Sequence, residues 1–228
     1  MRKFHILIII LIVITLTGCN PHTHTSLLLI DLTASIPQSS KRLEKIFVRN
    51  LIRRSSSGVF YLVPISSQGT EVNNHTFRIN LGMREWNQNQ MIHTKNIKIA
   101  RTKGLNLIDK FFGTDFHKRE GTDLIGTINN SVDGLHSIQR IYLISDLIQQ
   151  TADLDFSENL APPRRIEILH YLKTRGEIPS LRGVDVQILQ IGAGELSAHH
   201  LEQIHHFWEE FFKLAHVHHL EFTFISKS

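Results

Sequence analysis

Three short segments of the sequence concentrate oxygen-bearing side chains at points where the chain is expected to end a strand or begin a helix. They are Asp31-Leu-Thr33-Ala-Ser35, Gly121-Thr122-Asp123-Leu124 and Ser145-Asp146. Asp, Ser and Thr at such points commonly form caps and turns. In a parallel sheet, however, the carboxyl ends of the strands also form the edge where ligands bind. If the three segments meet at one such edge, their oxygen atoms form a ligand-binding site.

The elements that would position these segments alternate between buried strands and amphipathic helices. Continuous apolar runs at 27–30 and 141–144 directly precede Asp31 and Ser145, which is typical of central strands covered on both faces. Further strands are expected at 59–65, 75–81, 184–191 and 220–225, and helices at 39–54, 86–112, 122–135, 162–174 and 197–215. This alternation predicts an α/β fold, a Rossmann-like, open and mostly parallel six-stranded sheet with helices on both faces.

Two of these elements allow a more detailed expectation. In the helix at 39–54, apolar residues recur at three- and four-residue steps and should form its apolar face; they are Leu43, Ile46, Phe47 and Leu51. The runs at 59–65 and 75–81 are rich in β-forming residues and are expected to pair as a hairpin.

The order and spacing of the three polar segments resemble the metal-ion-dependent adhesion site (MIDAS) of von Willebrand factor A (vWA) domains. The family pattern is Asp-x-Ser-x-Ser, then a threonine, then an aspartate. Here Thr122 follows Asp31 by 91 residues, and Asp146 follows Thr122 by 24. The resemblance covers about residues 27–226, is weakest over 67–118, and implies a vWA-like fold.

The resemblance also implies a ligand set. Thr33, Ser35 and Thr122 would offer hydroxyl oxygens to a divalent cation, while Asp31 and Asp146 would act mainly through water. Mg²⁺ or Mn²⁺ suits such groups, because hard cations prefer oxygen ligands and Mg²⁺ keeps several waters. The hydroxyls are neutral, so the ion remains electrophilic. In this family, a glutamate or aspartate of a protein partner then binds it.

Two residues depart from the family pattern. Thr33 replaces the usual serine, which keeps the hydroxyl but adds a methyl group that restricts the rotamer. Leu147 replaces the glycine that often follows the aspartate. We therefore expect a differently shaped loop after Asp146 and weaker binding of the metal ion.

The N-terminal residues carry a separate signal. Arg2 and Lys3 precede an apolar run of eleven residues at 6–16. A membrane span needs about 20 residues, so this run suits an export signal instead. The following Leu16-Thr-Gly-Cys19 resembles the lipobox of bacterial lipoproteins, which implies that residues 1–18 are removed and that Cys19 is acylated. An ordinary cleaved export signal is the alternative.

This assignment divides the chain into a signal peptide at 1–18, the lipidated cysteine with a polar tether at 19–26, and a vWA-like domain at 27–228. Several acyl chains anchor a protein stably to a membrane. We therefore expect a location in the bacterial cell envelope. In a Gram-negative cell this would be the outer membrane. In bacterial lipoproteins, an aspartate directly after the acylated cysteine favours retention in the inner membrane, and here that residue is Asn20.

Composition supports one globular domain and argues against nucleic acid as a partner. The 228 residues are 41% hydrophobic and 20% charged, which excludes a disordered chain, and a single cysteine excludes a disulfide framework. The chain has 25 Lys and Arg against 21 Asp and Glu, with no run of five or six basic residues. A phosphate backbone would require a denser basic surface.

Enzymatic alternatives lack necessary residues. Asp31 could be the nucleophile of a haloacid-dehalogenase-type phosphatase, but that pattern requires an acid where Thr33 stands. The turn at 32–37 has no glycine for a dinucleotide, and the chain has no G-x-S-x-G elbow. We predict a binding module and not an enzyme. A structural component of an envelope-spanning secretion or conjugation assembly, using the fold without metal, is the alternative, and a phosphotransferase or hydrolase comes third.

Histidines are concentrated near the C-terminus, where seven of the fifteen lie between His199 and His219. Neither His199 nor His200 has a histidine four residues later, as a helical zinc pair requires. Two stripes run along opposite sides of the last expected helix. The polar stripe consists of His199, Glu202, His206, Glu209 and Lys213. The apolar stripe consists of Leu201, Ile204, Trp208, Phe211 and Ala215. The polar stripe is expected to face solvent.

Overall fold

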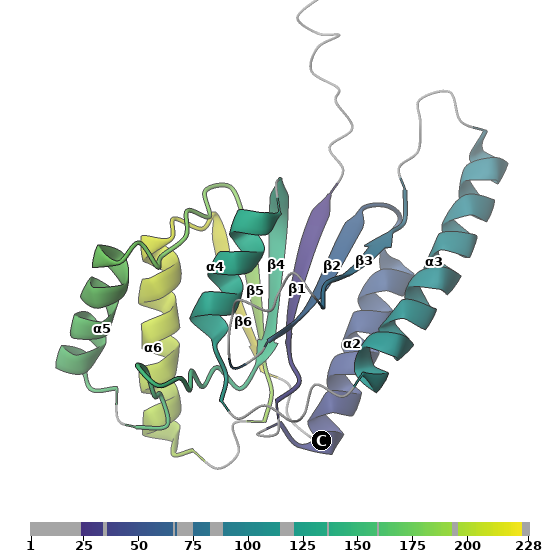
Figure 1. Cartoon of the computed structure of the whole chain (residues 1–228). Helices are drawn as coiled ribbons and strands as arrows, with labels where there is room; N and C mark the ends of the chain where they lie inside the picture. Colours follow the sequence, from purple (N-terminus) through teal and green to yellow (C-terminus); the bar gives the residue numbers. More distant parts are fainter. Residues whose placement is uncertain are drawn as a thin grey trace, which may run out of the picture.

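The domain is a six-stranded sheet between two layers of helices (Figure 1). This computed structural model describes residues 24–33, 36–65, 67, 75–82, 89–114, 121–135, 137–158, 160–192 and 196–224. The strands are β1 (Thr25–Asp31), β2 (Val59–Ile65), β3 (Phe77–Asn80), β4 (Ile138–Ser145), β5 (Asp185–Gln190) and β6 (His219–Phe224). Their order in the sheet is β3-β2-β1-β4-β5-β6. The predicted fold class is confirmed.

The pairing of the strands places the carboxyl ends of the five parallel strands at one edge of the sheet. β1 pairs in parallel with both β2 and β4, and β4, β5 and β6 continue in parallel. β2 and β3 form the antiparallel hairpin that the sequence predicted. β1 is buried along its whole length, as expected for a central strand between two helical layers.

The helices cover both faces of the sheet. In Figure 1, α2 (Gln38–Arg54) and α3 (Gln90–Gly113) lie on one face, and α4 (Leu124–Gly134), α5 (Pro162–Thr174) and α6 (Ala198–Leu214) lie on the other. A separate apolar core lies on each face. The core under α6 is rich in aromatic residues and includes Phe156, Phe207, Trp208, Phe211 and Phe212. None of the helices within the described ranges is long and apolar enough to cross a membrane.

Local signals in the sequence account for several helix starts. The side chains of Asn89, Asp123 and Ser197 accept hydrogen bonds from the first turns of α3, α4 and α6, respectively. α5 begins at Pro162, a position where the missing backbone N–H costs nothing.

α3 packs closely against the edge strand β3. Gly104 is buried there, and a Cβ atom at this position would lie 2.7 Å from Cγ2 of Ile79. Glycine therefore allows an approach that a larger residue would prevent. At the level of the α2 C-terminus, the Arg101 guanidinium donates hydrogen bonds to the carbonyl of Ser55, at 2.6 Å from Nη2 and 3.2 Å from Nε.

The start of β1 and the buried face of α2 differ from the prediction. β1 begins at Thr25, and Thr25 and Ser26 are buried, so these two residues belong to the sheet and not to the tether. In α2, the predicted apolar face is correct only in part, because Phe47 and Leu51 pack against the core but Ile46 is exposed. The buried stripe is Ser40, Lys41, Glu44, Val48 and Ile52. Val48 and Ile52 alone supply the apolar part of this stripe. The polar part lies toward the carboxyl edge of the sheet, where Asp31 ends β1.

Candidate metal centre

The three polar segments meet at the carboxyl edge of β1 and β4. Because Ile30 pairs with Ile144 in parallel register, the residues that follow each of them, Asp31 and Ser145, are also neighbours. The Ser145 hydroxyl donates to Oδ2 of Asp31 at 2.8 Å. Thr122, which is 89 residues from Thr33 in the chain, places its hydroxyl beside that of Thr33. The structure therefore brings together Asp31, Thr33, Thr122 and Asp146, four of the five predicted ligands.

Asp31 is fully buried, and its carboxylate is held at both oxygen atoms. Oδ1 accepts from the Thr33 hydroxyl at 2.6 Å and from the Thr33 backbone N–H at 3.1 Å, while Oδ2 accepts from Ser145. Burial raises the pKa of Asp31, although these hydrogen bonds and the nearby Lys41 ammonium act in the opposite direction. The raised pKa means that negative charge at Asp31 is costly unless positive charge lies close by.

Thr33 and Thr122 present two hydroxyl oxygens to each other. Their Oγ1 atoms are 3.4 Å apart, and both residues are buried. Adjacent ligands of an octahedral Mg²⁺ lie about 2.9 Å apart, so the two hydroxyl oxygens would need to approach by about half an ångström to bind one ion. The backbone of Thr122 is fixed by paired hydrogen bonds with Gln150, each 2.8 Å long. These backbone hydrogen bonds fix the point from which the Thr122 side chain extends toward Thr33.

Asp146 begins a loop whose shape explains the glycine of the family pattern. Leu147 adopts φ +69°, in the left-handed region that favours glycine. Its side chain is buried in the core, and its carbonyl accepts a hydrogen bond from Nε1 of Trp208 at 3.0 Å. The N–H of Ile148 donates to Oδ1 of Asp146 at 3.0 Å. The loop thus accommodates leucine through core packing and still directs Asp146 to the site.

Gln149 connects this loop to the start of α4, a role that the sequence analysis missed. Its Oε1 accepts from the N–H groups of Leu124 and Ile125 at 2.7 and 3.2 Å. Its Nε2 donates to Oδ1 of the capping Asp123 at 3.0 Å. Gln149 therefore fixes the helix start beside Thr122 relative to Asp146. No local sequence signal indicates this contact, because 26 residues separate Gln149 from Asp123.

Two further ionisable residues, Lys41 and Glu44, face the site from α2 and were also missed. The Lys41 ammonium donates to the carbonyl of Leu32 at 3.2 Å. Glu44 is fully buried, and neither of its carboxyl oxygens has a hydrogen-bond partner in the structure. Burial raises the pKa of Glu44 to about 9, and the charges of Asp31 and Asp146 act in the same direction. Glu44 is therefore neutral at pH 7. The spacing of Lys41 and Glu44 with Val48 and Ile52 is the signal that could have revealed them.

The donor set fits a hard divalent cation. It combines two carboxylates with neutral hydroxyls, all oxygen ligands of the kind that Mg²⁺ and Mn²⁺ prefer. Asp31 and Asp146 are both buried, and each raises the pKa of Glu44, so the site disfavours added negative charge and would gain from a cation. Ser35, the fifth predicted ligand, and Cys19, the predicted lipidation site, lie outside the described residues.

The histidines of α6 form no comparable centre. The residues of the predicted polar stripe are exposed, and His206 lies within 4 Å of the Glu202 and Glu209 carboxyl groups. Among the described residues, no group of three or more His, Cys, Asp and Glu side chains is arranged to hold a metal ion. The carboxyl edge, with its hydroxyl ligands, is therefore the candidate site.

Comparisons with known proteins give similarity at low sequence identity. No protein-family model and no curated protein matches the chain. The conserved hypothetical protein BatB from Bacteroides thetaiotaomicron is 11% identical, with 90% of this chain and 91% of that chain covered and a TM-score of 0.46. A von Willebrand factor type A structure from Catenulispora acidiphila is 13% identical, with 85% and 42% covered and a TM-score of 0.43. An uncharacterized membrane spanning protein from Vibrio fischeri is 13% identical, with 86% and 88% covered and a TM-score of 0.29.

The architecture itself agrees with the fold that the sequence motifs implied. The described residues form a mostly parallel sheet of six strands with an antiparallel strand at one edge. Helices cover both faces, and the polar segments lie at the carboxyl edge of the two central strands. This chain therefore has the Rossmann-like, open and mostly parallel six-stranded α/β fold that the sequence predicted.

Proposed function

We propose that this protein is a lipid-anchored component of the bacterial cell envelope that binds a protein partner through a divalent cation. The cation, Mg²⁺ or Mn²⁺, would be held by Asp31, Thr33, Ser35, Thr122 and Asp146. An acidic side chain of the partner would complete its coordination. The domain acts as a binding module and not as an enzyme.

The observation that carries this proposal is the convergence of Thr33 and Thr122. Their hydroxyl oxygens lie 3.4 Å apart, although 89 residues separate the two threonines in the chain. Asp31 and Asp146 lie at the same edge, where β1 and β4 end. Asp31 accepts hydrogen bonds from Thr33 and Ser145, which orient its carboxylate without neutralising it. Such a group supports a cation through water while the hydroxyls bind it directly.

The chemistry of these ligands explains why the bound ion would capture an acidic partner. Two carboxylates and three neutral hydroxyls leave a divalent cation with unused affinity for an anionic oxygen. Glu44 is neutral at pH 7 because its pKa is about 9, so it adds no third charge. A carboxylate from outside the chain is therefore the group that the ion lacks.

Isothermal titration with Mg²⁺ and with Mn²⁺ tests the proposed cation site. We expect saturable binding of one ion per protein molecule, because the donor set forms a single centre. A chain that uses the fold only as a structural part of an envelope assembly would show no saturable binding of either ion. That result would replace the adhesion-site proposal by the structural one.

The lipid anchor is a separate prediction. If Cys19 is acylated, the Cys19→Ala variant should incorporate no fatty-acid analogue when cells are labelled metabolically. Replacing an exposed residue far from the lipobox, as in Asn50→Ala, should leave the labelling unchanged. Equal labelling of the wild type and Cys19→Ala would contradict the anchor.

A further inference from the structure

The first turns of α3 project beyond the rest of the domain (Figure 1). The Arg101 side chain binds the Ser55 carbonyl, one residue after the end of α2, and Gly104 packs against Ile79 of β3. α3 begins at Gln90, eleven residues before Arg101. At 1.5 Å per residue, its start lies about 16 Å beyond this contact along the helix axis.

The projecting turns lie at the end of the sheet where the chain enters β1. Thr25 pairs with Val59, and Val59 pairs with Asn80, so the start of β1 and the end of β3 share that end. In Figure 1, the start of β1 and the start of α3 lie at the same end of the domain. Asp31, and with it the candidate metal centre, lies at the opposite end of β1.

The surface of these turns combines exposed apolar side chains with lysines. Met91 is 80% exposed, Ile92 54% and Ile99 46%. Lys95 and Lys98 lie between them at helical spacing and are exposed as well. A single exposed apolar residue is ordinary. Three within the first three turns of one helix, on the same face as two lysines, give this end of α3 both apolar and cationic groups that a bilayer surface can bind.

The helical layer that contains α3 is strongly basic. α2 and α3 together carry eleven Lys and Arg against two Asp and Glu, whereas α4, α5 and α6 carry four against five. Of the two acidic residues, Glu44 is buried and Asp109 forms ion pairs with Lys45 and Arg49. Two of the eleven, Arg53 and Arg54, are exposed at the end of α2 near the projecting turns. This layer therefore complements an anionic surface.

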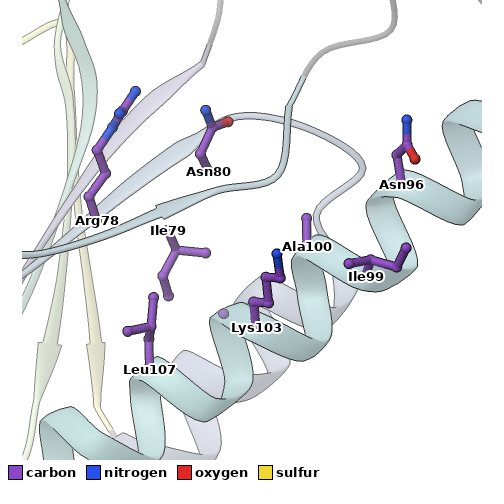
Figure 2. A pocket seen from close by; sticks show the side chains of 9 residues that line it. Arg78, Ile79, Asn80, Asn96, Ile99, Ala100, Lys103 and Leu107 are labelled. Atoms are coloured by element: carbon purple, nitrogen blue, oxygen red, sulfur yellow. The ribbon is translucent and has the colours of Figure 1, made fainter.

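A groove continues this surface between α3 and β3. Figure 2 shows Asn96 and Lys103 from α3 and Arg78 and Asn80 from β3 around it, with apolar side chains between them. Its volume is about 370 Å³. Cationic and amide groups around an apolar floor suit a phosphate headgroup next to its acyl chains.

We infer that the projecting turns of α3, together with Arg53 and Arg54, form a docking surface for an anionic lipid bilayer. Met91 and Ile92 insert among the lipids, while Lys95 and Lys98 contact their phosphate groups. The inference rests on the proposed lipid anchor for the choice of partner. Five residues separate Cys19 from His24 and span at most about 18 Å. This reach is close to the length by which α3 projects, so both contact one bilayer and the metal centre faces away from it.

Vesicle sedimentation of the chain 19–228 carrying Cys19→Ala tests the surface without the anchor. This chain contains every described residue. It should bind vesicles containing about one third phosphatidylglycerol and not vesicles of phosphatidylcholine alone. Lys95→Gln/Lys98→Gln should lower the partition coefficient by about ten-fold or more, and Met91→Ser/Ile92→Ser should also lower it. High salt should weaken binding of the wild-type surface.

Matched variants on the opposite layer distinguish a defined surface from general adhesion. Lys173→Gln/Lys213→Gln removes two exposed lysines, and Ile166→Ser removes an isoleucine that is 62% exposed. Both should bind vesicles like the wild type. Equal losses in both sets, unchanged binding of the α3 variants, or binding to single-stranded nucleic acid in place of vesicles would overturn the inference. Because this chain carries no acyl group, its result is independent of whether Cys19 labels with fatty acid.

Discussion

Replacing Thr122 by Ala should lower the affinity for Mg²⁺ by an order of magnitude or more, with a loss of roughly 1 kcal/mol in the free energy of unfolding. The substitution removes the hydroxyl that lies 3.4 Å from that of Thr33. The backbone hydrogen bonds between Thr122 and Gln150 remain, because they need no side chain. Isothermal titration measures the affinity, and urea unfolding measures the stability.

Thr122→Ser is the matched control, since it restores the hydroxyl and should recover most of the affinity. Asp31→Ala should lower the affinity further, but it leaves the donors of Thr33 and Ser145 without their acceptor, so it changes the stability of the fold as well. A partner that supplies a carboxylate should bind the wild type only with a divalent cation and should not bind Thr122→Ala. Equal affinities of Thr122→Ala and the wild type for Mg²⁺ would contradict the ligand assignment.

Glu44→Gln should become progressively more stable than the wild type as the pH rises. The pKa of Glu44 is about 9 in the folded protein, against 4.5 for an ordinary glutamate. Between these values the unfolded chain has lost the proton that the folded chain keeps, so the wild type loses stability with rising pH. The expected change is about 1.4 kcal/mol per pH unit in that window. Glutamine cannot ionise and escapes this loss.

The quantity to measure is the difference in the free energy of unfolding between Glu44→Gln and the wild type, from pH 5 to about pH 8. Taking the difference removes contributions that both proteins share, including that of Asp31. Asp133→Asn, which replaces an exposed carboxyl group on α4 by an amide, is the matched control. A Glu44→Gln difference that stays constant with pH would show that Glu44 is ionised in the folded protein.

The sequence was sufficient to predict which segments form the site. Apolar runs directly before Asp31 and Ser145 indicated buried parallel strands, and parallel strands end at one edge. The structure confirms that Asp31 and Ser145 are neighbours and that Thr122 joins them. Metal binding itself stays a prediction.

Other features depended on contacts that periodicity does not reveal. Several stripes of α2 contain apolar residues, and the buried one includes Lys41 and Glu44, whose burial arises from the position of α2 over the carboxyl edge. Leu147 occupies a left-handed conformation because its side chain fills the core and Trp208 binds its carbonyl. Thr25 and Ser26 join β1 through pairing with β2 and β4, although their polarity indicated a tether.

Paramagnetic broadening by Mn²⁺ in an amide NMR spectrum tests most directly whether a divalent cation binds at the carboxyl edge. Substoichiometric Mn²⁺ should broaden the signals of Thr33, Thr122 and Leu147 first. The signals of Thr25 and Val59, at the opposite end of the sheet, should remain sharp. Excess Mg²⁺ should restore the broadened signals by competition. Broadening centred on the histidines of α6 would contradict the proposed metal centre. The absence of saturable broadening anywhere in the spectrum would contradict it as well.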